Sequence, residues 1–131
     1  MDVYERTLSD EINRLAGKQV FFDVDRIVGL DQKTGNEVVG CLLSSACQSQ
    51  NDRPITLGRQ YLTMLPKEWV IDRIREVVTT VLDLNDDWEY RRFLELSEMI
   101  SIDLLRWAHE KGRGSNNPDV LEAYNDYIDH I

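Results

Sequence analysis

Residues suited to burial recur every three or four positions along most of the chain, as they do on one face of an α-helix. The clearest stretch is 84–100. Its stripe consists of Tyr90, Phe93, Leu94, Ser97 and Ile100, widened by Leu96 and Met99. Asn85, Asp86 or Asp87 can cap this helix, because their side chains accept hydrogen bonds from the free N–H groups of a first turn. The pattern predicts one amphipathic helix around which the rest of the chain is arranged.

The same spacing predicts further helices elsewhere in the chain, bounded by glycine, asparagine and proline. They cover residues 3–16, 20–28, about 37–48, about 54–65, 67–82 and 102–111, and a last helix begins at Pro118. Thr34 or Asn36 is a possible cap for the third of them. We therefore expect an all-α fold of about seven helices in a single domain, residues 1–131.

The segment 20–28 is ambiguous between strand and helix. Val20, Phe22 and Val24 alternate as in a strand, whereas the spacing of Val24 and Ile27 fits a helix. Residue propensity favours the strand. We interpret the segment as a helix, because no partner strand is evident and a lone strand cannot satisfy its backbone groups.

Three helix starts recur at a nearly constant interval. Asn51, Asn85 and Asn117 are separated by 85 − 51 = 34 and 117 − 85 = 32 residues. The helix after each start carries an aromatic residue followed by Leu or Ile, namely Tyr61-Leu62, Phe93-Leu94 and Tyr127-Ile128. One further helix lies between successive starts, an alternation typical of helical solenoids.

Roughly the last 80 residues resemble HEAT-type or related α-helical repeats of small bacterial proteins. The resemblance is carried by the Asn-Asp starts, by Leu-Pro-Lys-Glu-Trp at 65–69 and by Asn-Pro-Asp-Val at 117–120. It implies helical pairs that bind another macromolecule. We thus expect N-terminal helices over 1–35 and repeat-like antiparallel pairs over 36–131, stacked as a short solenoid, with an irregular bundle as the alternative.

The charge of the chain limits its partners. With 15 Lys and Arg against 24 Asp and Glu, the formal net charge is −9. Nucleic acid and anionic membrane surfaces are disfavoured, whereas a basic protein partner is permitted. No apolar span approaches a membrane-crossing length and no secretory signal is visible, so we expect a cytoplasmic protein in which Cys41 and Cys47 remain free thiols.

Catalytic and metal-binding motifs are missing from the sequence. It has two histidines, His109 and His130, without the spacing of a zinc site, and no phosphate loop or nucleophile elbow. We therefore predict no cofactor and no metal. Asp23 and Asp25 form the only carboxylate pair in apolar surroundings, which leaves a small metal-dependent hydrolase as one alternative. A structural subunit of a homo-oligomer is another.

Non-enzymatic protein binding is the function that the sequence favours. Trp and Arg are frequent anchors of protein interfaces, whereas we expect Trp69 to belong to the core. The predicted binding residues are Asp86, Asp87, Trp88, Glu89, Arg92, Glu95 and Trp107. One concrete form would be an immunity or inhibitor protein whose acidic residues cover the cationic site of a basic toxin or enzyme.

Overall fold

The computed structural model describes all 131 residues and is entirely helical. Its elements are α1 (Val3–Ala16), α2 (Val24–Val28), α3 (Gln32–Gln48), α4 (Asp52–Met64), α5 (Lys67–Val81), α6 (Asp87–Ile100), α7 (Ile102–Glu110), α8 (Pro118–Asp126) and a 3₁₀ turn, Ile128–His130. The all-α prediction is confirmed, with eight helices in place of about seven.

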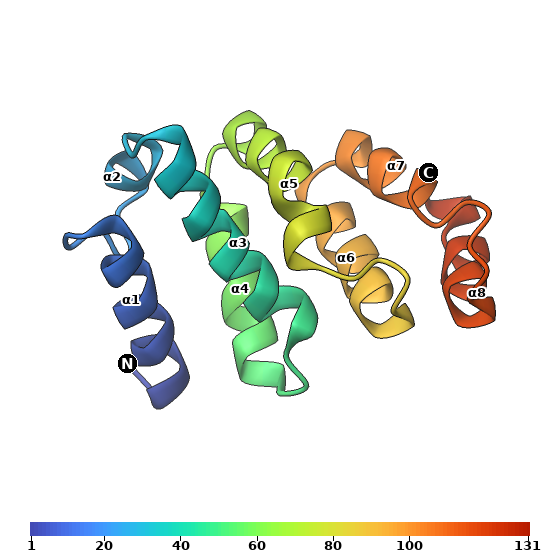
Figure 1. Cartoon of the computed structure of the whole chain (residues 1–131), viewed down its shortest axis with the longest axis horizontal. Coiled ribbons are helices and arrows are strands. Elements are labelled where there is room, and N and C mark those ends of the chain that lie inside the picture. Colours follow the sequence, from blue (N-terminus) through green and yellow to red (C-terminus); the bar gives the residue numbers. More distant parts are fainter.

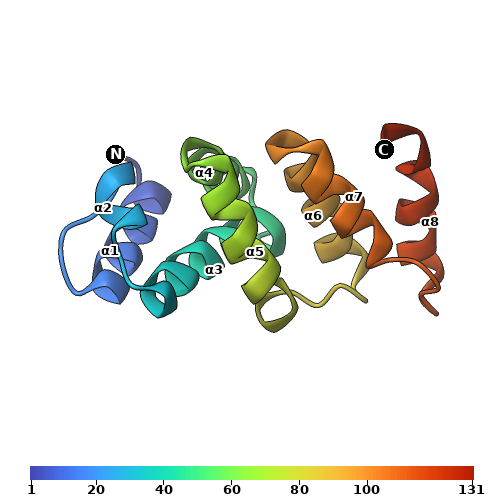
Figure 2. The same cartoon turned by 90° about the horizontal axis from the view of Figure 1, so that it is seen from above.

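The helices stack along one axis, so that the two chain termini lie at opposite ends of an elongated molecule (Figure 1). Seen from above, α5 and α7 form one layer, with α4 and α6 in the layer behind them (Figure 2). Consecutive helices form close pairs in α3 with α4 and in α6 with α7, whereas α5 packs mainly on α3. The arrangement agrees with stacked helical pairs.

Two helices share the centre of the fold. α6 packs against α3, α4, α7 and α8, and α3 packs against α1, α4, α5 and α6. The stripe predicted for α6 is buried, including Leu96, except that Met99 is 53% exposed. The sequence pattern of α6 thus identified a central helix, and the structure shows that α3 is equally central.

Side-chain caps fix where most helices begin. Asp86 caps α6 by accepting from the Glu89 N–H at 3.1 Å. Asp31, rather than Thr34 or Asn36, caps α3, which therefore begins five residues earlier than expected. The reason is that the Asp31 carboxylate accepts from both the backbone N–H and the hydroxyl of Thr34, at 2.8 and 3.2 Å.

The ambiguous segment contains a shorter helix than predicted. Only Val24–Val28 is helical, because Asp23 caps this turn by accepting from the Arg26 N–H at 3.1 Å. The backbone N–H groups of Val20 and Phe21 instead donate to the Asn13 side chain, at 2.8 and 3.0 Å. A side-chain acceptor on α1 thus satisfies these two N–H groups without a partner strand.

The three asparagines do not play equivalent parts. Asn117 caps α8, and Asn51 stands at the cap position of α4 without a side-chain cap bond. Asn85 precedes the cap of α6, and its carbonyl accepts from the Asn117 side chain at 2.8 Å. The interval in the sequence therefore marks corresponding helix starts rather than a repeated capping contact.

Candidate protein-binding surfaces

The predicted surface at the start of α6 centres on Trp88, whose side chain is 39% exposed. The Arg92 guanidinium lies 4.2 Å from the centre of the Trp88 ring. Arg92 also pairs with Glu95 at 2.6 Å, within the same helix. One face of the indole is therefore covered by a cation of the protein itself.

The acidic residues of this surface are mostly engaged within the protein. Asp86 is the cap, and Glu89 accepts from the Gln48 side chain at 2.7 Å and from the Asp83 N–H at 3.1 Å. Glu95 pairs with Arg59 of α4 as well as with Arg92. Among the predicted carboxylates, Asp87 alone has no hydrogen bond or ion pair to its side chain. These groups hold α6 onto α3 and α4, which reduces what they can offer a partner.

Trp107 makes a different set of contacts from Trp88. It projects from α7, half-buried, and packs edge-on against Phe93 with ring centres 6.4 Å apart. Arg75 of α5 and Lys111 lie over its ring, at 5.7 and 4.4 Å. The cation over Trp88 comes from α6 and those over Trp107 come from α5 and the end of α7, so the two indoles have different partners.

A groove of about 700 Å³ runs over α3, between α1 and α5. We call it the α3 groove. From α3 it is lined by one continuous helical face, Lys33, Asn36, Glu37, Gly40, Cys41 and Ser44. Its walls are Glu11 and Leu15 of α1, and Glu76, Val77, Thr80 and Val81 of α5. No helix of the protein covers this face of α3.

A second hollow of about 490 Å³ extends the groove along the first turns of α1. The two share Glu11, Cys41 and Ser44, so they form one continuous depression. Val3 and Tyr4 border the extension and are 64% and 43% exposed. Exposed apolar side chains beside a depression are a common feature of interaction surfaces.

The floor of the groove is apolar and is formed by small side chains. Gly40, Cys41 and Ser44 carry small side chains, and Leu15, Val77 and Val81 flank them, half-buried against the core. Gly40 lies so close to α5 that an added Cβ would stand 3.2 Å from a methyl group of Val81. Gly40 is therefore buried against α5, and an incoming segment would meet the small side chains of Cys41 and Ser44.

Three carboxylates stand around this floor, against one cation, Lys33. Glu76 accepts from Asn36 at 2.8 Å and from Gln32 at 3.0 and 3.1 Å, and these hydrogen bonds lower the pKa of its carboxyl group. Hydrogen bonds from Arg14 likewise lower the pKa of Glu11. Glu37 has no ion-pair partner. Glu11 and Glu76 are thus engaged within the protein, as Glu89 and Glu95 are, and Glu37 is the rim carboxylate that remains free for a partner.

Both cysteines are free thiols, as predicted. Burial raises the pKa of Cys41 to about 11 and that of Cys47 to about 12. Cys41 in the groove floor is therefore protonated near neutral pH, when a thiol is a weak nucleophile. It serves here as a small neutral surface rather than as a reactive group.

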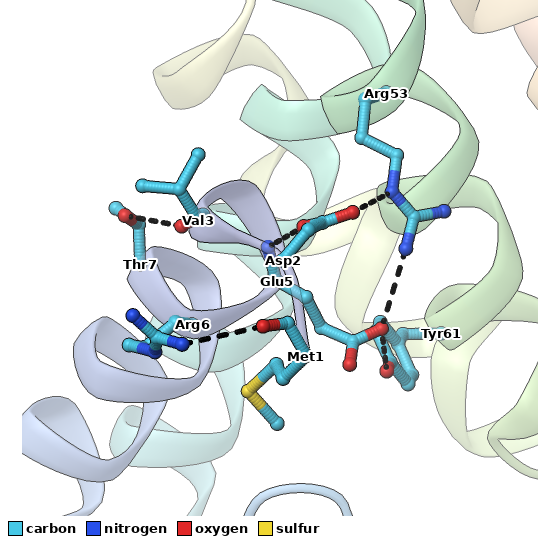
Figure 3. A network of polar contacts seen from close by, with 8 residues as sticks. All are labelled: Met1, Asp2, Val3, Glu5, Arg6, Thr7, Arg53 and Tyr61. Carbon is cyan, nitrogen blue, oxygen red and sulfur yellow. Dashed lines mark hydrogen bonds and ion pairs between the residues drawn. The ribbon is translucent and has the colours of Figure 1, made fainter.

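A polar network at the start of α1 positions one wall of the groove (Figure 3). Arg53 of α4 donates from Nε to Asp2 at 2.5 Å and lies 3.6 Å from a carboxylate oxygen of Glu5. The Tyr61 hydroxyl donates to Glu5 at 3.1 Å. These contacts hold the N-terminal half of α1 against α4, which fixes the distance between α1 and α3.

The residues considered for catalysis or metal binding have structural contacts. Asp23 caps α2 and pairs with Arg26 at 3.6 Å, and no three His, Cys, Asp or Glu side chains lie close enough together to hold a metal ion. His109, in the last turn of α7, is buried. Its Nε2 lies 2.8 Å from the Tyr124 carbonyl and its ring stacks on Tyr124, with centres 3.9 Å apart. His109 thus joins α7 to α8.

No protein-family model, curated protein or solved structure matches this chain. The likeness to HEAT repeats therefore remains a resemblance in sequence pattern. None of the helices combines the length and the apolar character needed to cross a membrane.

Sequence reasoning did not identify the α3 groove. The small residues of α3 were an available signal, since such residues permit a close approach by another helix. In the structure Gly58 of α4 lies against the backbone of Leu42 and Ala46, and Gly40 lies against Val81 of α5. Cys41 and Ser44 line the groove.

Proposed function

We propose that this protein is a non-enzymatic interaction module that binds a basic segment of a protein partner in the α3 groove. The observation that carries the proposal is an uncovered apolar floor ringed by Glu11, Glu37 and Glu76. Lys33 is the only cation among the lining residues.

The charge of the whole chain supports the same proposal. A formal net charge of −9 produces a field that attracts cationic partners over long distances and accelerates their encounter. An acidic inhibitor or immunity protein that covers the cationic site of a toxin or enzyme is one form that such a module would take. Asp87 and the exposed part of Trp88 would then provide a secondary contact outside the groove. The free thiols favour a reducing compartment such as the cytoplasm.

Affinity capture tests the proposal. The protein is immobilised, exposed to extract from its source cells at low ionic strength, and eluted with increasing salt. We expect basic proteins to be retained and then released by salt, because screening weakens attraction between exposed charges. Recovery of only acidic proteins, or of none, would contradict the proposal. A variant with Glu37→Lys and Glu76→Lys serves to show whether retention depends on the groove.

A further inference from the structure

We propose that the segment held in the α3 groove is a cationic amphipathic α-helix of the partner, lying along α3 between α1 and α5. This inference rests on the proposed function and adds the conformation and the chemistry of the ligand. It follows from the shape of the groove, from its floor and from the placement of its charges.

The shape of the groove matches a helix. The face from Lys33 to Ser44 covers eleven steps along α3, which at 1.5 Å per residue corresponds to about 17 Å, or three helical turns. α1 borders it through a second helical stripe that includes Leu8, Glu11 and Leu15. Every lining element is a helix, so the groove offers no sheet edge to which an extended peptide could hydrogen-bond. A helix satisfies its own backbone groups and needs none.

The floor matches the apolar face of such a helix. Cys41 and Ser44 have small side chains that allow close approach, and Leu15 and Val77 stand on opposite sides. A partner helix with Leu or Ala at every third or fourth position would contact the floor with that face, as in other helix-in-groove complexes.

The charges of the groove indicate which residues the flanks of the partner helix should carry. Glu11 stands on the α1 wall, Glu37 on α3 and Glu76 on the α5 wall, so cations on either flank would meet a carboxylate. Arg14 and Arg73 partly offset Glu11 and Glu76, at 2.6 and 3.5 Å, whereas Glu37 is unpaired. A second copy of this chain, with the same net charge of −9, would be repelled.

The test uses a designed peptide of about four turns, with a stripe of leucine and lysine on both flanks. One control peptide has the same composition in an order that removes the stripe, and another has glutamate in place of lysine. Binding to the intact protein is measured by titration calorimetry at low and at moderate salt. We expect the stripe peptide to bind at least tenfold more tightly than either control.

Cys41 reports where the peptide binds. Iodoacetamide alkylates thiolates, so the reaction is run at mildly alkaline pH, where the half-buried Cys41 has a small thiolate fraction, and mass spectrometry follows each cysteine separately. Bound peptide should slow the alkylation of Cys41 severalfold, whereas fully buried Cys47 should remain slow throughout. Tight binding without protection of Cys41 would place the helix elsewhere and overturn the inference, and the proposed function would then depend on the capture experiment and its Glu37→Lys, Glu76→Lys variant.

Matched variants complete the test. Thr80→Arg places a cation in the groove, and Thr79→Arg adds the same charge at an exposed neighbour that does not line it. Glu37→Lys is likewise matched by Glu122→Lys on α8. We expect each groove variant to weaken binding about tenfold and each control about twofold or less, and equal effects would overturn the inference. Circular dichroism tests whether each of the four variants folds. The comparison requires that both members of at least one matched pair are folded.

The remaining outcomes separate the two proposals. If basic proteins are captured from extract but the stripe peptide does not bind, the helical ligand is wrong and the module stands. If neither binds, both proposals fail.

Equal binding of the reordered peptide indicates charge attraction alone, and protection of Cys41 only by an uncharged apolar dye indicates a small-molecule site. Self-association that is lost in Thr80→Arg would assign the groove to a second copy. Each of these results overturns the helical ligand.

Discussion

Single residues control how closely the helices of this protein approach one another. A Cβ added at Gly58 would stand 2.6 Å from the Ala46 nitrogen and 2.7 Å from the Leu42 carbonyl oxygen, both in the α3 backbone. At Gly40 it would meet only a methyl group of Val81, at 3.2 Å. A side chain can rotate away, whereas a packed helix backbone cannot.

We expect Gly58→Ala to destabilise the fold and Gly40→Ala to be nearly neutral. Alanine gains up to about 1 kcal/mol in helix propensity at either position. At Gly58 that gain is outweighed by an overpacking cost of roughly 1–3 kcal/mol or more, because α3 and α4 must separate. Urea unfolding measures both variants. Equal stabilities would show that the α3–α4 contact tolerates a methyl group.

Helices that are neighbours in space but not in sequence are joined by ion pairs as well as by the core. Arg53 joins α4 to α1 through Asp2, and Arg59 joins α4 to Glu95 of α6. Arg91 joins α6 to Asp126 of α8 at 3.0 Å. The pairs form a series from one end of the molecule to the other along α1, α4, α6 and α8, which are neighbours in Figure 1.

We expect Arg53→Gln to loosen α1 with little loss of global stability. Its ion pairs are substantially exposed, so the free energy of unfolding should fall by about 1 kcal/mol or less. Amide hydrogen exchange in the first half of α1 should accelerate, because the Tyr61 hydroxyl would be the only polar group of α4 left on Glu5. The control is Arg113→Gln, which breaks an exposed pair with Glu110 at 3.6 Å. Unchanged exchange in α1 would show that apolar packing alone holds it.

The whole molecule is an acidic stack in which several carboxylates have structural contacts. Hydrogen bonds lower the carboxyl pKa values of Asp2, Glu11, Asp31 and Glu76, through capped N–H groups in Asp2 and Asp31 and through side-chain donors in the two glutamates. These residues lie on or next to α1, α3 and α5, the three helices around the groove. Their ionisation therefore stabilises the part of the fold that we propose to bind a partner.

We expect the protein to lose stability on acidification. The unfolded chain, with ordinary carboxyl pKa values of 3.8 and 4.5, takes up protons before the folded chain does. The contribution of these groups is thus fully present above those values and disappears as the pH falls through the lower folded pKa values. Thermal unfolding across the acidic range measures the effect. Glu11→Gln with Glu76→Gln should show a shallower dependence, and an identical slope would contradict our assignment.

The sequence by itself determined the helices, most of their boundaries and the buried stripe of α6. These features depend on local chemistry, since a cap such as Asp86 or Asn117 acts on the turn beside it and apolar spacing follows the helical period. The late start expected for α3 and the length expected for the segment 20–28 were wrong. In α3 several polar residues competed for the cap, and at 20–28 the deciding acceptor, Asn13, lies on another helix.

Only the tertiary structure decided which surfaces remain open. Glu89 and Glu95 suggested a binding face in the sequence, but contacts to Gln48 and Arg59, distant along the chain, engage both within the protein. Conversely, Cys41 lies in an apolar run of the sequence, but the spacing of α1 and α5 leaves its side chain only half-buried, in the floor of the groove. Exposure depends on the packing of segments far apart in sequence. A periodic pattern in one helix indicates that a face is apolar, but it does not indicate what covers that face.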